Sequence, residues 1–316
     1  MDALSEVLGH VRLKDTSWAC VLAGTPWGLE LEEMKGCVRF HYVTRGSCWL
    51  SAGVAQPRIA LSGGDLAVLP HGHAHTLREQ PRSRVTSLRE AMQSAASRST
   101  STDHHVKVGG GGAETNIVHG AFIIDDPDDA PILATLPPVI RITPDAGEPV
   151  PSFVQNLQFI SRELDLGRPG SKLVLTRMAD VILVQLLRAY IESLPEGSEG
   201  FLGALRDKHM AAALGMMHHS PEEPWTVARL ADEVGLSRSG FAARFSKLVG
   251  ETPLAYLTRL RMRRASLLLR KGATLAKVSR MTGYSSEASF SHAFRQWVGV
   301  APGAYRRKER PEERQD

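Results

Sequence analysis

The sequence predicts an α+β protein in which a β-rich N-terminal barrel precedes an all-α C-terminal domain with two helix-turn-helix motifs joined by a linker helix. Three observations support this fold class. A spaced pattern occurs twice between residues 225 and 305, short apolar segments alternate between residues 13 and 77, and two long amphipathic segments lie between residues 152 and 194. The 316 residues suffice for two domains that each bury their own core.

Short strands are expected in the N-terminal region. Residues 27–33 alternate apolar and polar side chains, residues 38–43 and 48–52 are further strand candidates, and residues 45–47 form a turn between them. The apolar segment within residues 117–124 indicates that the sheet resumes there.

Residues 64–75 have the spacing Gly-x5-Pro-x-Gly-x2-His, which resembles the second conserved motif of the cupin barrel. His41 lies where the first cupin motif would have its His-x-His pair, but Val43 replaces the second His and no Glu follows at the usual distance. The resemblance implies a cupin-like barrel, a double-stranded β-helix, that senses a small molecule, a metal or an oxidant.

Three histidines are the candidate effector or metal residues of this barrel. His41 and His75 are expected at its mouth, where they would bind a divalent metal with His73 as a third nitrogen. The alternative is that they line a ligand cavity or only make hydrogen bonds. The sequence fixes no cofactor, and the divalent metal remains one candidate.

The three cysteines lack a CxxC pair, which argues against a disulfide framework or a structural zinc knuckle. Cys37 and Cys48 lie on expected strands and are typical of buried small residues. Cys20 is expected to precede the barrel and to be accessible, which makes it the redox candidate.

Connecting segments and helices are expected beyond residue 93. Residues 94–113, rich in Ser, Thr and Gly, predict a flexible loop, and residues 127–151, with seven prolines, predict a connector that ends the barrel. Helices are expected over residues 152–166, 171–194 and 201–219. The second of these helices either forms a homodimer or packs on its own barrel.

The C-terminal segment contains the same pattern twice, which a generic helical bundle has no reason to do. With one extra residue in the second turn, the corresponding pairs are Gly235 and Gly283, Phe241 and Phe290, Phe245 and Phe294, Gly250 and Gly299, Pro253 and Pro302, and Tyr256 and Tyr305.

Each copy has the local features of a helix-turn-helix. A Gly ends the first helix, an apolar residue fills the turn, and a Ser caps the second helix. These residues are Gly235, Leu236 and Ser237 in the first copy and Gly283, Tyr284 and Ser285 in the second. The paired Phe residues anchor one side of the second helix, which leaves the other side free to enter a major groove of DNA.

A linker helix is expected over residues 253–269, with Thr252 as its cap and Pro253 at its first position. Its length of roughly 25 Å can hold two reading helices about one DNA turn apart.

Residues 229–241 resemble the first motif of the AraC/XylS family of bacterial transcription regulators, and residues 283–302 resemble the C-terminal signature of that family. A cupin-type sensor is found in one subgroup of the family. The resemblance implies a sequence-specific regulator whose partners are promoter DNA, an unknown effector and, for an activator, RNA polymerase.

The resemblance also implies which residues contact DNA. Base contacts are expected from Arg238, Ser239, Ala242 and Ala243 in the first reading helix and from Glu287, Ala288, Ser291 and His292 in the second. Phosphate contacts are expected from Arg244, Lys247 and Arg295. Ala243 and His292 occupy positions where relatives usually have Arg, so the strong guanine contact is missing at both.

The charge distribution agrees with this assignment. Residues 221–310 contain 17 Lys and Arg against 7 Asp and Glu, a net charge of +10, whereas the remainder has 21 against 27, a net charge of −6. A solvated basic surface is the alternative for any single residue.

The expected domains are a sensor over residues 1–150, a helical linker over 151–206, a DNA-binding domain over 207–310 and a tail over 311–316. No segment approaches 18 apolar residues and residues 1–10 lack a signal-peptide pattern, so a cytoplasmic, nucleoid-associated protein without a membrane contact is expected. The alternative function is a metal-dependent cupin enzyme fused to a DNA-binding domain, and the incomplete first motif argues against it.

Overall fold

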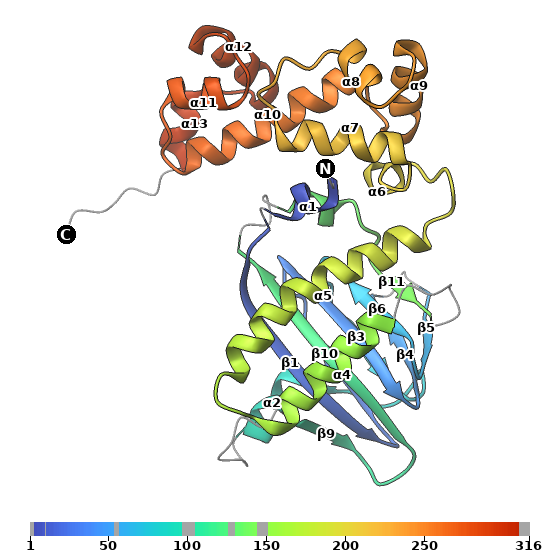
Figure 1. Cartoon of the computed structure of the whole chain (residues 1–316). Helices are drawn as coiled ribbons and strands as arrows, with labels where there is room; N and C mark the ends of the chain where they lie inside the picture. The colour runs from blue at the N-terminus through green and yellow to red at the C-terminus, as the bar shows by residue number, and fades with distance from the viewer. Residues whose placement is uncertain are drawn as a thin grey trace, which may run out of the picture. The chain divides into compact units, whose positions relative to one another are not determined.

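The computed structural model describes residues 3–9, 11–53, 57–96, 105–125, 130–143 and 151–309. The chain forms two compact units (Figure 1). We call residues 10–194 the β unit, and residues 1–9 together with 195–316 the helical unit. The fold is therefore α+β, as the sequence predicts.

Two sheets make up the β unit. The larger has the strand order β11-β6-β3-β10-β1-β9, and the smaller has the order β5-β4-β7-β2-β8. The strands are β1 Leu13–Gly24, β2 Gly28–Leu31, β3 Cys37–Arg45, β4 Ser47–Ser51, β5 Ile59–Ser62, β6 Leu66–Leu69, β7 His75–Arg78, β8 Thr86–Ser87, β9 His105–Gly109, β10 Glu114–Ile124 and β11 Ile140–Ile142.

The core of the β unit lies between the two sheets. Val43 and Ile117 from the larger sheet and Leu50 and Leu77 from the smaller one belong to the same buried cluster. Side chains two residues apart on a strand point to the same face, so every second residue of β3, β4, β7 and β10 points into this interior. The interior is packed with apolar side chains over most of its length.

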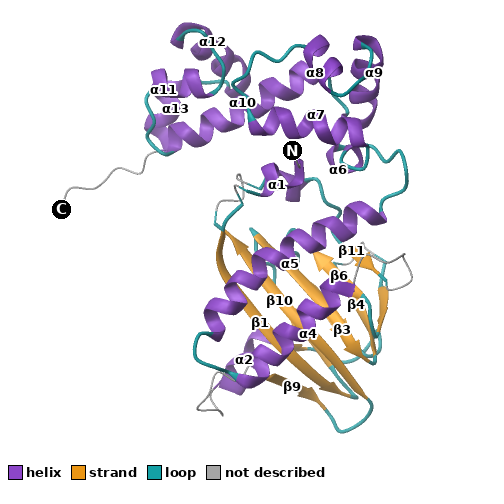
Figure 2. Ribbon diagram, viewed as in Figure 1, coloured by secondary structure: helices purple, strands orange, loops and turns teal. Residues whose placement is uncertain are grey.

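The described residues of the β unit also form four helices: α2 Leu88–Ala96, α3 Pro131–Ala134, α4 Pro151–Leu166 and α5 Ser171–Ser193. The last two lie across the larger sheet (Figure 2). The outward face of that sheet presents Trp18, Phe40 and Phe122, whose ring centroids are 5.3–5.7 Å apart. The expected helices over residues 152–166 and 171–194 are present within one residue at each end.

Two expectations for connecting segments are wrong in part. The expected loop over residues 94–113 contains β9, which pairs in parallel with β1 and buries Val106 in the core. The expected connector over residues 127–151 contains β11, which pairs with β6. Backbone hydrogen bonds to a neighbouring strand, rather than local composition, determine the secondary structure of both segments. Residues 97–104, 126–129 and 144–150 lie outside the described residues.

The helical unit contains α1 Ala3–Leu8, α6 Phe201–Ala204, α7 Lys208–His219, α8 Val227–Glu233, α9 Arg238–Val249, α10 Pro253–Arg270, α11 Leu275–Met281, α12 Glu287–Val298 and α13 Pro302–Glu309. The single helix expected over residues 201–219 is divided into α6 and α7. Asp207 causes the break, because its carboxylate accepts hydrogen bonds from the backbone N–H groups of His209 and Met210 and so starts a new helix.

The first helix of the chain belongs to the helical unit rather than to the barrel. Ala3 is part of the same buried cluster as Met210 and Phe245, and Glu6 pairs with His219 at 3.0 Å. The two units therefore meet in the sequence near residue 10 and between Leu194 and Pro195. These positions differ from the boundaries expected at residues 150 and 206, and the tail over 311–316 lies outside the described residues.

In the described part of the chain, no helix combines the length and the apolar character that crossing a membrane requires.

Candidate nucleic-acid interface and ligand sites

Both helix-turn-helix copies are stabilised by hydroxyl caps. The Ser237 hydroxyl accepts a hydrogen bond from the Gly240 N–H at 3.1 Å, as expected for the start of α9. In the second copy the cap is Ser286, which accepts from the Ser289 N–H at 3.1 Å, and the expectation of Ser285 is wrong. The extra residue in the second turn moves the cap one position along the chain.

The two turns have the same backbone geometry. Gly235 has φ +68° and Gly283 has φ +77°, values that an L-residue adopts only with strain. The Leu236 N–H donates to the Ala231 carbonyl and the Tyr284 N–H donates to the Ser279 carbonyl, both at 2.9 Å. The two copies are therefore equivalent units, as the repeat predicts.

The linker helix α10 joins the cores under the two reading helices. The first core contains Phe241 and Phe245 with Tyr256 of α10, and the second contains Phe290 and Phe294 with residues further along α10. Thr252 caps α10 and Pro253 is its first residue, as predicted. Because both cores use the same rigid helix, α9 and α12 are held at its two ends (Figure 1).

The predicted contact residues lie on the outward sides of the reading helices. Two of them, Ala242 and Ser291, are half-buried. The exposed ones are Arg238, Ser239, Ala243, Arg244 and Lys247 in α9 and Glu287, Ala288, His292 and Arg295 in α12. None is part of the apolar clusters of this unit, so the surface they form is available to a ligand.

The predicted phosphate contacts differ in their surroundings. Arg244 pairs with Asp207, with its Nε 2.6 Å from Oδ2, and Asp207 also caps α7. Within the described residues, Arg238, Lys247 and Arg295 make no ion pair. Arg244 is therefore held in position by its neighbour, whereas Lys247 and Arg295 are available to phosphates and Arg238, a predicted base contact, is available to base edges.

The barrel interior brings together three histidines. Nε2 of His41 and Nε2 of His75 are 2.7 Å apart, and the ring of His119 stacks on that of His41 with centroids 4.9 Å apart. All three side chains are buried. His119 was not among the predicted residues. It pairs with His41 across β3 and β10, and its position two residues after Ile117 on a strand is the signal that places it inside.

Burial in the apolar interior holds these histidines neutral. It lowers the pKa of His75 to about 4 and that of His119 to about 3, and it holds the pKa of His41 well below its usual value. The Nδ1–H of His75 donates to the His73 carbonyl at 2.8 Å, so its Nε2 accepts from the Nε2–H of His41. Nδ1 of His41 and Nδ1 of His119 have no hydrogen-bond partner among the described residues.

Of the three expected metal ligands, His41 and His75 belong to this cluster and His73 does not. His73 contributes its carbonyl to His75, while its ring is exposed and lies against the ring of His71. The distance between Nε2 of His41 and Nε2 of His75 is that of a neutral hydrogen-bonded pair.

Cys20 is not accessible, contrary to expectation. It does not precede the barrel, because β1 is twelve residues long and begins at Leu13. Its side chain is 7% exposed. Burial raises the pKa of the Cys20 thiol, which is opposite to what a reactive sensor thiol requires. Cys37 and Cys48 are buried, as predicted.

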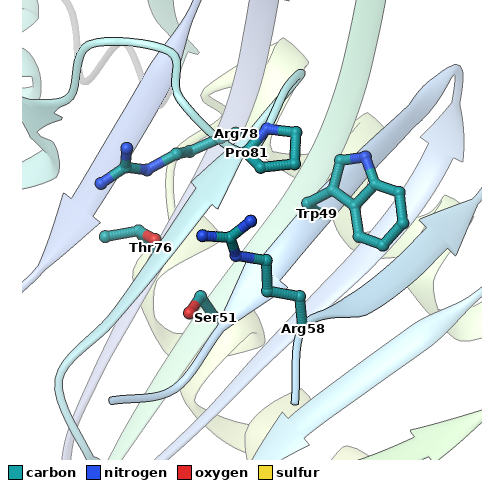
Figure 3. A pocket seen from close by; sticks show the side chains of 6 residues that line it. All are labelled: Trp49, Ser51, Arg58, Thr76, Arg78 and Pro81. Carbon is teal, nitrogen blue, oxygen red and sulfur yellow. The ribbon is translucent and has the colours of Figure 1, made fainter. Parts of the chain in front are cut away.

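A pocket lies on the outer face of the smaller sheet (Figure 3). It encloses about 370 Å³, part of which is open solvent, and its lining residues are Trp49, Ser51, Arg58, Thr76, Arg78 and Pro81. The indole of Trp49 is partly exposed, and the Arg78 guanidinium is held by a hydrogen bond that its Nη1 donates to the Ser83 carbonyl at 2.9 Å. Two cationic groups and an aromatic surface thus share one cavity.

Comparison with known proteins decides the family. A family model described as cupin matches residues 2–192, and one described as a helix-turn-helix domain matches residues 230–308. A putative AraC-like transcription regulator of Streptomyces lividans is 34% identical over 97% of this chain and 98% of its own length. The chain belongs to the AraC-like transcription regulators.

Two further relatives support this family assignment. A putative AraC-like transcription regulator of Streptomyces antibioticus is 33% identical and covers 98% of this chain and 100% of its own length. The regulator AlkR of Acinetobacter baylyi is 29% identical, with 98% and 100% covered. The relatives are transcription regulators, which decides against the alternative of a cupin enzyme. This AraC-like regulator therefore combines a DNA-binding helical unit with a cupin-type sensor.

Proposed function

We propose that this regulator recognises a specific promoter sequence by placing α9 and α12 in two successive major-groove segments of double-stranded DNA. The observation that carries the proposal is the pair of equivalent, capped, twelve-residue helices, each with one buried Phe pair and an exposed opposite side. The major groove admits a helix of this size, and its base edges distinguish all four base pairs. Because its target promoters lie on the chromosome, the proposed regulator acts in the bacterial cytoplasm.

Within each of the two helices, some residues recognise bases and others bind phosphates. Ser239, Glu287 and Ser291 carry polar groups that can bond to base edges, whereas Lys247 and Arg295 lie nearer the C-terminal ends of their helices and bind phosphates. Glu287 accepts from a cytosine amine. Ala243 and His292 leave the guanine contact of relatives unmade, so the preferred sequence differs from theirs.

The test is selection of bound sequences from a random DNA library by the full-length chain. The proposal predicts a single enriched motif whose two conserved parts are about one helical turn apart. Substituting Ser291 and Glu287, which both lie in α12, should change only one of the two conserved parts of the motif. Uniform recovery of the library, or a motif unchanged in this double variant, would contradict sequence recognition by α12.

We further propose that the effector is a small organic anion with a planar apolar part, bound in the pocket of Figure 3. The support is chemical. The guanidinium groups of Arg58 and Arg78 suit a carboxylate, and the Trp49 indole, 37% exposed, offers a flat apolar surface.

The effector proposal is tested with a panel of aromatic carboxylates, such as benzoate and salicylate, and with benzamide as the uncharged control. Quenching of the Trp49 fluorescence, identified by its loss in Trp49→Phe, should occur with the acids and not with the amide. Arg58→Gln should weaken binding at least tenfold, whereas Arg45→Gln, at an exposed arginine of β3, should not. Equal response to acid and amide would contradict an anion site.

We also propose that α5 contributes to a homodimer. It exposes Leu173 and Val181, two large apolar side chains, to solvent, although its other face packs within the β unit. Analytical ultracentrifugation should find a dimer for the natural chain and a monomer for the Leu173→Glu/Val181→Glu variant. A natural chain that sediments as a monomer at micromolar concentration would contradict this contact.

A further inference from the structure

Cys20, His105 and Asp165 come together outside the barrel interior. Their ligand atoms, a thiol sulfur, an imidazole nitrogen and a carboxylate oxygen, all lie within 4.8 Å of one another. Nε2 of His105 is 2.9 Å from Oδ1 of Asp165. No other group of three His, Cys, Asp or Glu in the described part of the chain meets this criterion.

The fold explains why three distant residues meet. Cys20 on β1 and His105 on β9 are direct partners in a parallel pair of strands. The neighbours of Cys20, Ala19 and Val21, belong to the interior core, so the Cys20 side chain points to the opposite face, which α4 covers. Asp165 lies in the last turn of α4, and the Ser161 hydroxyl one turn earlier is 3.8 Å from the Cys20 sulfur.

We propose that these three side chains form a binding site for Zn²⁺. Thiolate, imidazole and carboxylate are the ligand types that this ion takes in proteins, at distances of about 2.0–2.3 Å. Tetrahedral binding needs ligand atoms roughly 3.3–3.8 Å apart. Ligand atoms already within 4.8 Å reach that separation through small side-chain rotations.

Water completes the coordination. The side chains of His105 and Asp165 are 30% and 49% exposed, so solvent reaches one side of the site while Cys20 closes the other. Three protein ligands and one water form the usual arrangement of a zinc site that keeps an open position. On binding, the Cys20 thiol loses its proton to solvent as the sulfur–zinc bond forms.

The metal would add a further link between three elements that are already joined by packing, by the ladder between β1 and β9, and by the His105–Asp165 and Cys20–Ser161 contacts. It would fix the C-terminal turn of α4 to β1 and β9. After residues 167–170 the chain continues into α5, which ends at Ser193, two residues before the helical unit begins in sequence at Pro195. Zinc in the β unit would therefore stiffen the helical hairpin that leads to the DNA-binding unit. This consequence rests on the proposed function, whereas the binding site itself does not.

The site is tested by titrating the full-length, metal-free chain with Zn²⁺ by calorimetry and with Co²⁺ by absorption spectroscopy. The expected result is one metal per chain with a dissociation constant below 1 μM, which corresponds to a binding free energy more favourable than about −8 kcal/mol. Bound Co²⁺ should give a near-ultraviolet thiolate-to-metal band. The barrel histidines, which offer no thiolate, cannot produce it.

Two variants of partly exposed ligands, His105→Asn and Asp165→Asn, should each weaken zinc binding at least tenfold. The matched controls are His73→Asn and Asp15→Asn, both at exposed positions of the same unit, and neither should change it. Circular dichroism verifies that the variants are folded, and Cys20→Ser should abolish the cobalt band. Binding without that band, binding unaffected by His105→Asn and Asp165→Asn, or no binding at micromolar metal would overturn the site.

DNA binding by the same preparations, with and without Zn²⁺, is measured separately. A zinc site without any change in DNA affinity would leave the site standing and would overturn only its regulatory role.

Discussion

The two helix-turn-helix copies share their backbone but differ in what supports them and in the charge that they present. Their reading helices have twelve residues each and end at a glycine with φ near +85°. The first copy lies on a cluster of fourteen buried side chains that includes α1, α6 and α7, whereas the second lies on a cluster of six. The second copy therefore depends more on each of its own apolar contacts.

The two reading helices also differ in net charge, although a simple duplication would give them the same charge. The first reading helix carries Arg238, Arg244 and Lys247 and no acidic residue, whereas the second carries Glu287 and Arg295, which cancel. We therefore expect attraction to phosphates mainly from the first copy, whereas the second copy offers polar groups with little net charge. The proposal therefore predicts that the first copy contributes mainly to affinity and the second mainly to sequence selection.

The largest expected effect is that of removing one Phe from each core. Phe294→Ala and Phe245→Ala should each cost about 3–5 kcal/mol of folding free energy. In Phe294→Ala the loss should unfold α11 and α12 locally, because their cluster is small, while α8 and α9 stay protected. Hydrogen exchange of the two helices measures this. Equal loss of protection in α9 and α12 would show that the two cores are one cooperative unit.

Substituting the turn glycines should separate the copies by a smaller amount. Alanine at either position is strained by roughly 1–2 kcal/mol because φ is positive. A Cβ on Gly283 would also lie 2.4 Å from the Glu222 carbonyl oxygen, whereas a Cβ on Gly235 would meet nothing within 4 Å. Urea unfolding should therefore find Gly283→Ala less stable than Gly235→Ala. A reversed order would contradict the close packing of the second turn.

Salt dependence should identify the phosphate contacts. Lys247→Gln and Arg295→Ala should each lower the slope of log affinity against log salt by about one. Arg295→Ala should weaken binding to all sequences almost equally. Lys172→Gln, at an exposed lysine of the β unit, is the control and should change nothing. A change in preferred sequence on Arg295→Ala would mean that α12 is rotated from the proposed orientation.

The smallest expected effect concerns one hydroxyl. Ser291 corresponds to Ala242 in the first copy, so Ser291→Ala makes the two positions alike. It should cost on the order of 1 kcal/mol at one or two base pairs and leave the salt slope unchanged. Competition between the selected site and its single-base variants measures this. An equal loss on every sequence would assign Ser291 to positioning rather than recognition.

The helical unit could be predicted closely because its signals are local. The Ser237 cap, the Thr252-Pro253 start of α10 and the spaced Phe pairs are each decided within a few residues. The error at Ser285 is also local, since two successive serines are equally good caps. The first helix of the chain could not be assigned, because its partner α7 lies some two hundred residues away in sequence.

The β unit was predicted less well because long-range pairing decides it. His119 meets His41 only through the register of β3 and β10, and Cys20 is buried only because α4 and neighbouring strands cover β1. The strands β9 and β11 lie in segments whose composition favours loops. Spacing along the chain identified the cupin resemblance, but it could not indicate which side chains share a face.

The most direct test of two-helix recognition is hydroxyl-radical footprinting of the full-length chain on its selected DNA site. The account predicts two protected stretches about one helical turn apart on one face of the duplex. Phe294→Ala should remove one stretch and leave the other. A single protected stretch in the natural chain, or the loss of both in Phe294→Ala while α9 remains folded, would contradict recognition by two separate helices.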